Sequence, residues 1–414
     1  MAVDTSKSRA ISGNLYVGLL LGFALFFPTK YFSLYHAVAV IIAAVPLLLF
    51  LKVQLNTFAI VTVFGVLSIA LSVLYTVFFL DLDIVRNTTE FFRFLPFLLL
   101  LLAIRHIRCN VSFLLKLMLF YTLINFVVAV MQFFDLGAVS LVGKIYSSEL
   151  HANVSLSSNN RALGLSTGPG QHGAIMALLF AIFLSYFITL GRHSLLSLAG
   201  MLLSAFSVML SQSQTSFIVV VGILFYGCMY LLLKGGRAVR GKLYFVLGAS
   251  TLFMLTIVIV LYDYLKYLFT LFTLGFGRSS YQARLEKWNY IIDVIWSNPA
   301  GLLFGQGKDA FGAVSGAMDN EYLFLLGVYG IFGLTLILTL YGIVIVISWF
   351  SARCSLTPHW TALHLFVVSG IVLAWPTIFV LDPRVLIIIV VLLGLHKAEK
   401  AGHLMPFSAR ASAA

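Results

Sequence analysis

Residues 319–350 read DNEYLFLLGVYGIFGLTLILTLYGIVIVISWF, a short polar start followed by an apolar run that continues to Phe350. A helix needs about 20 apolar residues to cross the hydrocarbon core of a bilayer, so this run is long enough to span a membrane. A polar segment, residues 265–320, precedes it, and another apolar run, Leu243–Tyr264, comes before that segment. Because only 10% of the residues are charged, a polar segment between two apolar runs is where chemistry is expected first.

The composition of the whole chain is typical of a polytopic membrane protein. Of its 414 residues, 61% are hydrophobic, and the mean hydropathy is +1.05. Each remaining polar stretch is shorter than about 60 residues, which is too short for an independent domain of ordinary size. We therefore predict an all-α fold in which residues 1–401 form a single transmembrane helical bundle. The small-residue tail, 402–414, is predicted to be disordered.

Apolar segments of roughly spanning length predict about twelve transmembrane helices. Their expected bounds are 11–27, 31–51, 57–80, 91–104, 111–134, 173–190, 195–210, 216–233, 243–264, 321–350, 360–380 and 385–396. Several are shorter than a straight span requires, so tilted or locally thinned ends are expected. Two long polar loops, about 135–172 and 265–320, separate these segments into groups.

The charges of the connections predict how the bundle is oriented. If the N-terminus is cytoplasmic, every cytoplasmic connection is net basic, while acids and bases roughly balance on the other side. The positive-inside rule then makes both termini cytoplasmic and both long loops extracytoplasmic. The same rule explains the net charge of +12 without a nucleic-acid partner, because the basic residues are dispersed and no nucleic-acid-binding motif occurs.

The first long loop ends with SLSSNNRALGLSTGPGQHG, residues 155–173. Its glycines let backbone amides approach a ligand closely, and Arg161 can hold a pyrophosphate through paired donors. A helix is expected to begin near His172 and Gly173, where its partial positive charge suits an anion. The alternative is a capped surface loop with one solvated arginine. We favour an anion-binding role for Arg161.

The second long loop contains RSSYQARLEKW, residues 278–288, which has helical potential. Tyr281, Arg284 and Trp288 recur about one turn apart, so they are expected on one face, close to Arg278. That face would offer a guanidinium to phosphate and aromatic rings to sugars. An interfacial helix, with aromatic rings at headgroup depth and charges reaching into water, is an equally good interpretation and is compatible with the first.

The segment Asp319–Tyr322 closes the second loop and begins the next helix. A helix N-cap at Asp319 or Asn320 explains these residues without any function, and the segment alone favours that interpretation. Two carboxylates and an amide, Asp319, Asn320 and Glu321, could also position and deprotonate a hydroxyl group.

Further charges lie just before and within the segment predicted to start at residue 91. Asp81 and Asp83 form an acidic pair of the kind that can hold a metal, but no histidine supports them, and we predict no metal. Arg93 is followed by apolar residues at the expected membrane edge, where an unpaired cation is costly. Arg93 therefore either forms a salt bridge with Glu90 or binds a lipid phosphate.

Taken in order, these features resemble the O-antigen polymerase (Wzy) and O-antigen ligase superfamily of polytopic membrane glycosyltransferases. The resemblance rests on RALGLSTGPGQHG at 161–173, SQSQTS at 211–216, the RxxxW pair Arg284 and Trp288, Pro299 before Gly305 and Gly307, and DNEYLFLLGVYGIFGL at 319–334. It implies polymerisation or transfer of glycans carried on undecaprenyl pyrophosphate, at the periplasmic face of a bacterial inner membrane.

The resemblance also implies roles for particular residues. Arg161 and either Arg278 or Arg284 would hold the pyrophosphate. Ligases of the superfamily carry a catalytic histidine where this chain has Asp319, and that departure favours a polymerase. It leaves Asp319, Glu321 and His172 as candidates for the general base, with Asn320 and Tyr322 beside them.

In the implied reaction, a hydroxyl of the incoming lipid-linked repeat attacks the anomeric carbon of the growing chain, with inversion, and undecaprenyl pyrophosphate leaves. Fixed arginines can neutralise the leaving group, so no metal or cofactor is expected. The resemblance implies a GT-C-like enzyme. Donor and acceptor are both lipid-linked glycans, and membrane lipids, a chain-length regulator and a flippase are possible partners. The alternatives are a ligase-type glycan transferase and a secondary transporter or lipid-linked glycan flippase, although a transporter would place ionisable residues at mid-membrane.

Overall fold

The structure is a computed structural model that describes residues 5–50, 56–80, 90–137, 139–158, 160–190, 194–234, 237–262, 279–316, 319–351, 358–375 and 382–400. All regular secondary structure in these residues is helical, which confirms the predicted all-α class. The predicted disordered tail, 402–414, and the acidic pair Asp81 and Asp83 lie outside the described residues.

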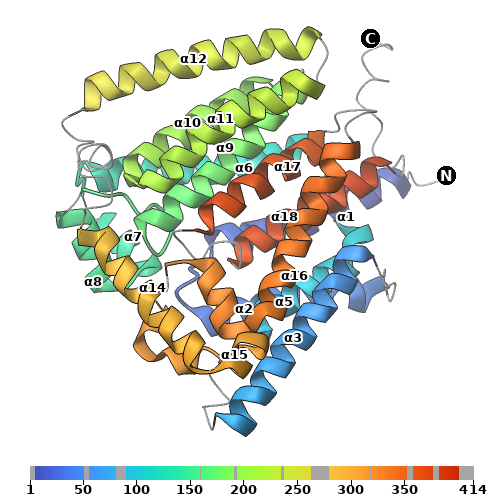
Figure 1. The fold of residues 1–414 in the computed structure, drawn as a ribbon. Helices are drawn as coiled ribbons and strands as arrows, with labels where there is room; N and C mark the ends of the chain where they lie inside the picture. The colour runs from blue at the N-terminus through green and yellow to red at the C-terminus, as the bar shows by residue number, and fades with distance from the viewer. Residues whose placement is uncertain are drawn as a thin grey trace.

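Figure 1 shows the helices, labelled in chain order. They are α1 (Thr5–Phe26), α2 (Phe32–Phe50), α3 (Thr57–Phe79), α5 (Phe91–Leu102), α6 (Val111–Phe133), α7 (Val139–Tyr146), α8 (Glu149–Asn153), α9 (Pro169–Thr189), α10 (Ser194–Ser211), α11 (Gln214–Lys234), α12 (Arg237–Leu261), α14 (Ser279–Ser297), α15 (Pro299–Phe304), α16 (Glu321–Ser351), α17 (Pro358–Leu373) and α18 (Pro383–Lys400). Short 3-10 segments, η1 (Ile104–His106) and η4 (Asp309–Gly316), and one π-helical turn, η2 (Val154–Ser158), lie between them.

Among the described residues, seven helices are long and apolar enough to cross a membrane by length and composition: α2, α3, α6, α9, α10, α11 and α16. Helices α1, α5 and α17 carry shorter apolar stretches. Each of the twelve predicted apolar segments overlaps a helix. The number of twelve crossings and the orientation of the bundle stay predictions.

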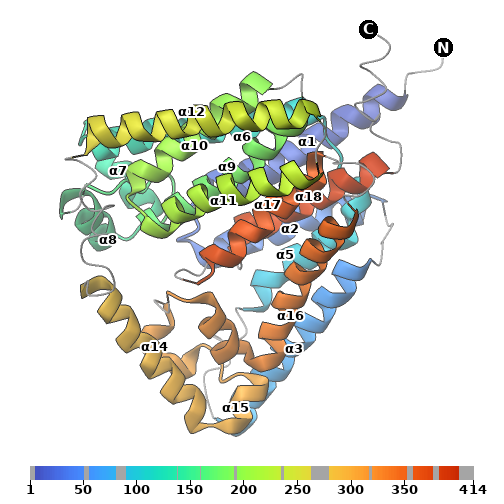
Figure 2. The ribbon, with the colours of Figure 1, turned by 45° about the horizontal axis from the view of Figure 1, so that its top comes forward.

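Helix α9 is the most deeply buried of these helices. Of the residues in its apolar stretch, 94% are buried, and α10, α11 and α17 pack around it (Figures 1 and 2). Its apolar residues face every direction, which is stable only in a helix surrounded by other helices or by lipid. The N-terminal end of α9 therefore has a fixed position. The glycine-rich loop, residues 161–168, leads directly into it.

Helix α16 is bent, whereas the apolar run predicts one continuous helix over residues 321–350. Gly330 interrupts it with φ +70° and ψ −171°, a conformation open essentially to glycine alone. The end of α15 crosses at this point, because a Cβ atom on Gly330 would lie 2.2 Å from the Leu303 carbonyl oxygen. The Gln306 amide then donates to the Gly327 carbonyl, at 2.7 Å. The single predicted helix is thus two helical segments, joined where the turn after α15 docks.

Both predicted long loops contain helices. Helices α7 and α8 lie in the first loop, while α14 and α15 lie in the second. The helix predicted around residues 278–288 is confirmed by α14, which begins at Ser279. In both views α14 begins near α8, so the two loops lie at the same end of the bundle (Figures 1 and 2).

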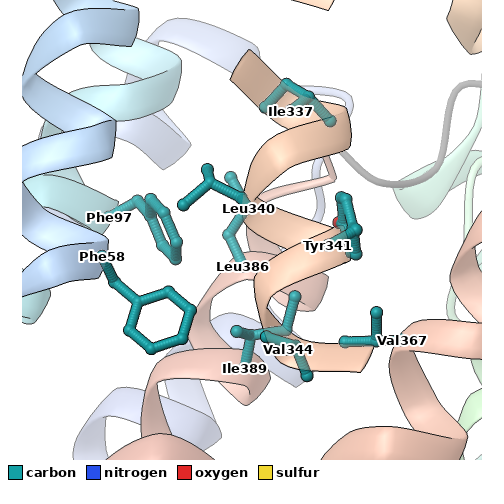
Figure 3. A pocket seen from close by; sticks show the side chains of 9 residues that line it. All are labelled: Phe58, Phe97, Ile337, Leu340, Tyr341, Val344, Val367, Leu386 and Ile389. Carbon is teal, nitrogen blue, oxygen red and sulfur yellow. The ribbon is translucent and has the colours of Figure 1, made fainter. Parts of the chain in front are cut away.

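A small pocket lies among α3, α5, α16, α17 and α18 (Figure 3). It is lined by Phe58, Phe97, Ile337, Leu340, Tyr341, Val344, Val367, Leu386 and Ile389. The lining carries no charged group, so the candidate site for phosphate or sugar chemistry has to be sought elsewhere.

Candidate functional site

Two amide side chains of α6 accept hydrogen bonds from the backbone of the glycine-rich loop. The Oε1 atom of Gln132 accepts hydrogen bonds from the backbone amides of Leu163 and Gly164, at 2.9 and 2.8 Å. The Oδ1 atom of Asn125 accepts another from Leu165, at 3.0 Å. Gly164 has φ +52°, and a Cβ atom there would lie 2.3 Å from the His172 ring. This position therefore requires glycine, and the loop has a defined path.

Arg161, the predicted anion ligand, lies at the start of this loop and is half-buried. Its backbone amide donates to the Ser155 carbonyl at 2.9 Å, and its Nε donates to the Ser211 carbonyl at 3.3 Å. Ser211 is the last residue of α10, just before the turn to α11, so the polar SQSQTS segment and the RALG segment lie together. These contacts fix the base of the Arg161 side chain at the end of the bundle.

The second predicted cation, Arg284, lies on α14 and faces Asp319. Its Nε is 3.7 Å from Asp319 Oδ2, and the two side chains retain 37% and 39% of their accessible surface. Asp319 has φ +45°, a left-handed conformation that aspartate tolerates better than most residues. An ion pair this exposed contributes little to stability, so both groups are available to a ligand.

His151, on α8, interacts electrostatically with a charged residue of each long loop, Arg161 and Asp319. Its pKa is lowered, first by partial burial and then by the positive charge of Arg161, while the Asp319 carboxylate acts in the opposite direction. The imidazole lies against Gly168, where an added Cβ atom would be 2.8 Å from Nε2. Arg161, His151, Asp319 and Arg284 therefore share one electrostatic environment. Sequence reasoning missed His151, although its position in the same loop as Arg161 was a usable signal.

A row of aromatic rings adjoins Arg284. The Trp288 ring lies 6.3 Å from Tyr281 and 6.1 Å from Trp375, in edge-on geometry, and Trp375 lies 6.3 Å from Tyr322. Trp288 is buried, whereas Trp375 is 58% exposed. The predicted set Tyr281, Trp288 and Tyr322 is thus brought together by Trp375, which follows α17. Sequence reasoning missed Trp375, because its position at the end of an apolar run gives no sign of its neighbours.

The other residues of the Asp319–Tyr322 segment are turned inward. Asn320 caps α16, since its Oδ1 accepts a hydrogen bond from the Leu323 amide at 3.1 Å. Glu321 is fully buried, and its backbone amide donates to the Ala374 carbonyl at 2.9 Å. The Tyr322 hydroxyl donates to the Ile371 carbonyl at 2.6 Å. Asp319 is therefore the exposed carboxylate of this segment.

His172, the third candidate base, lies inside the bundle. It is fully buried within the first turn of α9, beneath Gly164. A substrate at the exposed end of the site would not touch its ring in this conformation. Arg278 lies outside the described residues.

Arg93 forms the predicted salt bridge with Glu90, at 3.0 Å between Nε and Oε2. Lys308 binds the other oxygen of Glu90 at 3.2 Å, and the Tyr329 hydroxyl donates to the same carboxylate. Burial alone would raise the pKa of Glu90, but Arg93, Lys308 and the Tyr329 hydrogen bond outweigh it and lower the pKa. This buried cluster ties the turn after α15 to α5, and it leaves Arg93 only 9% exposed.

The described residues contain no group of three or more His, Cys, Asp or Glu side chains arranged to hold a metal ion. What the site offers instead is two guanidinium groups, one imidazole, one exposed carboxylate and an aromatic row. Those groups suit an anionic ligand with sugar rings attached.

Residues 199–338 match a family model described as O-antigen ligase. The match supports membership of the O-antigen polymerase and ligase superfamily. No curated protein matches the chain. The matched residues run from α10 into α16, and they include the Ser211 turn, Arg284, Trp288 and Asp319. Arg161 and His151 precede the matched region.

Proposed function

We propose that this protein is a bacterial surface polysaccharide polymerase that joins oligosaccharide repeat units carried on undecaprenyl pyrophosphate. Membership of the superfamily supports a membrane glycan transferase of the O-antigen type. The observation that carries the finer proposal is the ion pair of Arg284 with Asp319, beside an aromatic row and at the same end of the bundle as His151 and Arg161 of the other long loop. The charge pattern of the connections supports a periplasmic position for that end.

The exposed ion pair between Arg284 and Asp319 is weak enough for a ligand to replace Asp319 as the partner of Arg284. At 3.7 Å and with both side chains more than a third exposed, it contributes at most about 1 kcal/mol. A pyrophosphate brings more charge and more acceptor oxygens than one carboxylate, so it can displace Asp319 from Arg284. Arg161 supplies a second guanidinium from the other loop. The donor's pyrophosphate would then lie between the two arginines.

Displacement leaves the Asp319 carboxylate free to act as the general base. In the proposed step, a hydroxyl oxygen of the acceptor repeat forms a bond to the anomeric carbon of the donor chain. The bond between that carbon and the pyrophosphate oxygen breaks, and undecaprenyl pyrophosphate leaves with the electron pair. Asp319 takes the hydroxyl proton. Glu321 and His172 are fully buried, so Asp319 is the member of the predicted set that an acceptor reaches without rearrangement.

The aromatic row provides a surface for the glycan. Sugar rings present an apolar face that packs on aromatic side chains, and Trp375 exposes such a ring next to buried Trp288. The row begins at Tyr281, one turn from Arg284 on the same helix, so a glycan bound there would have its reducing end near the cations.

A ligase-type transfer is the second candidate, and the description of the matched family favours it. Asp319 stands where ligases of the superfamily carry their catalytic histidine, and for that reason we place polymerisation first. Both reactions use the same pyrophosphate contacts, and they differ in the acceptor.

The test compares surface polysaccharide, separated by size on gels, in a strain lacking the gene and complemented with wild type or a variant. The variants are Arg161→Ala, Arg284→Ala and Asp319→Ala. Arg240→Ala is the matched control, because it removes an exposed arginine from α12. Protein levels in the membrane are measured for each.

Loss of long chains, with single repeat units still delivered to the surface, supports a polymerase. Loss of all surface glycan, with full-length chains left on the lipid carrier, overturns polymerisation in favour of a ligase. Repeat units trapped on the cytoplasmic side overturn both. Normal chain length in all three site variants would overturn the assignment of Arg161, Arg284 and Asp319 to the site.

A further inference from the structure

A buried ion pair, Asp382 with Arg384, lies at the start of α18 and has no part in the proposed chemistry. Both side chains are almost inaccessible, at 4% and 2% relative exposure. The Nη2 atom of Arg384 is 2.5 Å from Asp382 Oδ2, and Nε is 2.9 Å from Oδ1. The backbone amide of Arg384 also donates to Asp382 Oδ1, at 2.9 Å. The pair is therefore fixed with respect to its own backbone.

Stability alone explains such a pair poorly. Removing two charges from water is expensive, and apolar residues of similar volume often serve a fold as well or better. A buried pair at the start of a helix is therefore better explained by a specific function, such as fixing one conformation. The guanidinium has donors beyond those used by Asp382, and their partners indicate what that function is.

The remaining donors of Arg384 contact the glycine-rich loop. Nη1 donates to the Ser166 hydroxyl and Nη2 to the Gln171 side-chain oxygen, each at 3.4 Å. The same Gln171 oxygen accepts a hydrogen bond from the Thr167 hydroxyl. One guanidinium thus connects both ends of the turn 166–171, through which the loop enters α9.

Other contacts hold the first part of the same loop. Gln132 and Asn125 bind the backbone of residues 163–165, and the Ser211 carbonyl holds Arg161. Arg384 supports the second part, 166–171, from a different helix. The loop that carries Arg161 is therefore supported on both sides of Gly164.

We propose that Arg384 is a positioning residue, which holds the glycine-rich loop in the conformation that presents Arg161 to the pyrophosphate. Asp382 compensates its charge and fixes its direction. The proposal rests on the proposed function, because it assigns Arg384 a role in the same binding site without contact to the substrate.

The test measures binding of undecaprenyl pyrophosphate to the purified full-length protein in lipid nanodiscs. Arg384→Ala is avoided, because it would leave Asp382 buried without its partner. Arg384→Lys keeps the charge but lacks the planar fork that reaches Asp382 and the loop together. Ser166→Ala combined with Gln171→Ala removes the loop contacts and leaves the ion pair intact. Tyr186→Phe is the matched control, since it deletes a buried 2.7 Å hydrogen bond to His359 at the far end of the same helix, α9.

We expect Arg161→Ala to weaken binding about 10- to 100-fold, as loss of a charge-assisted contact does. Arg384→Lys and the Ser166/Gln171 double variant should each weaken it about 5- to 20-fold. Added to Arg161→Ala, either change should have almost no further effect, because both act through Arg161. Tyr186→Phe should bind as wild type does, whatever its melting temperature.

Two results would overturn the positioning role while leaving the proposed function in place. One is wild-type binding by Arg384→Lys and by the Ser166/Gln171 variant when Arg161→Ala binds weakly. The other is a multiplicative effect of these changes with Arg161→Ala, which would indicate a general loss of structure. Equal binding of undecaprenyl pyrophosphate by wild type and Arg161→Ala would instead overturn the proposed function itself.

Discussion

Replacement of Gly330 by alanine tests whether the bend of α16 holds the two halves of that helix in place. Gly330 has φ +70° and ψ −171°, and an added Cβ atom would lie 2.2 Å from the Leu303 carbonyl oxygen and 2.5 Å from the Gly305 nitrogen. Both neighbours are backbone atoms of a packed segment, so neither can move aside as the end of a flexible side chain would.

The cost can be estimated from two contributions. A residue other than glycine in such a backbone conformation costs about 1–3 kcal/mol. Overpacking against fixed neighbours typically adds about 1–3 kcal/mol. The sum, about 2–6 kcal/mol, is a large part of the 5–15 kcal/mol that ordinarily separates folded from unfolded states. We therefore expect Gly330→Ala to lower the melting temperature of the purified protein by several degrees.

The matched control is Gly342→Ala in the same helix, where an added Cβ atom would have no neighbour within 4 Å. Alanine is the better helix former by about 1 kcal/mol, so this variant should melt at or above the wild-type temperature. Thermal unfolding in one detergent, followed by tryptophan fluorescence, compares the two. Equal melting temperatures for Gly330→Ala and Gly342→Ala would refute the steric reasoning.

Three further predictions follow from the site. Glu90→Gln should destabilise the protein by about 3–5 kcal/mol at neutral pH, because Arg93 and Lys308 lose their buried counter-charge. The wild type should lose the same stabilisation as the pH falls below the ordinary carboxyl pKa of 4.5, and the variant should not. Unfolding measured at several pH values checks both expectations. The pKa of His151 in the folded state lies below its ordinary 6.5, so protonation of His151 destabilises the fold as the pH falls below that value. His151→Gln should therefore show a smaller fall in melting temperature than wild type between pH 7.5 and pH 5.5. Trp375→Ala should raise KM for the lipid-linked glycan roughly 2- to 12-fold, the equivalent of about 0.5–1.5 kcal/mol of ring stacking. The melting temperature should change little, because the ring is exposed. An unchanged KM would show that the aromatic row does not bind the glycan.

The helices were predictable because hydrocarbon imposes a simple rule. Each long apolar run became a helix, since a spanning chain must pair its own backbone groups. The bend at Gly330 was not predictable, because a glycine within an apolar run can equally be a helical residue, as Gly342 is. The deciding fact is the chain at Leu303 crossing Gly330, a contact between segments that the local sequence does not record.

The candidate site was predictable in part. Arg161, Arg284 and Asp319 could be proposed from the sequence because charged residues are rare in this chain and stand out in its loops. His151, Trp375 and the pair at the start of α18 were missed. Their roles depend on which helix ends lie together, and one sequence does not give that arrangement.

Arg93, Arg284 and Arg384, all among the described residues, have carboxylate partners that differ in how easily a ligand could replace them. Arg93 and Arg384 bind carboxylates that are themselves buried, at 3.0 and 2.5 Å, so a phosphate would have to displace a partner that water cannot reach. Arg284 lies 3.7 Å from a carboxylate that is 39% exposed, and solvent already competes for that contact. A ligand that arrives and leaves in every catalytic cycle needs the second kind of arginine, because a strongly bound counter-charge would compete with it. Arg93, predicted from the sequence as either a lipid-phosphate ligand or a partner of Glu90, therefore fits the second role, and the pyrophosphate is better assigned to Arg284 together with Arg161.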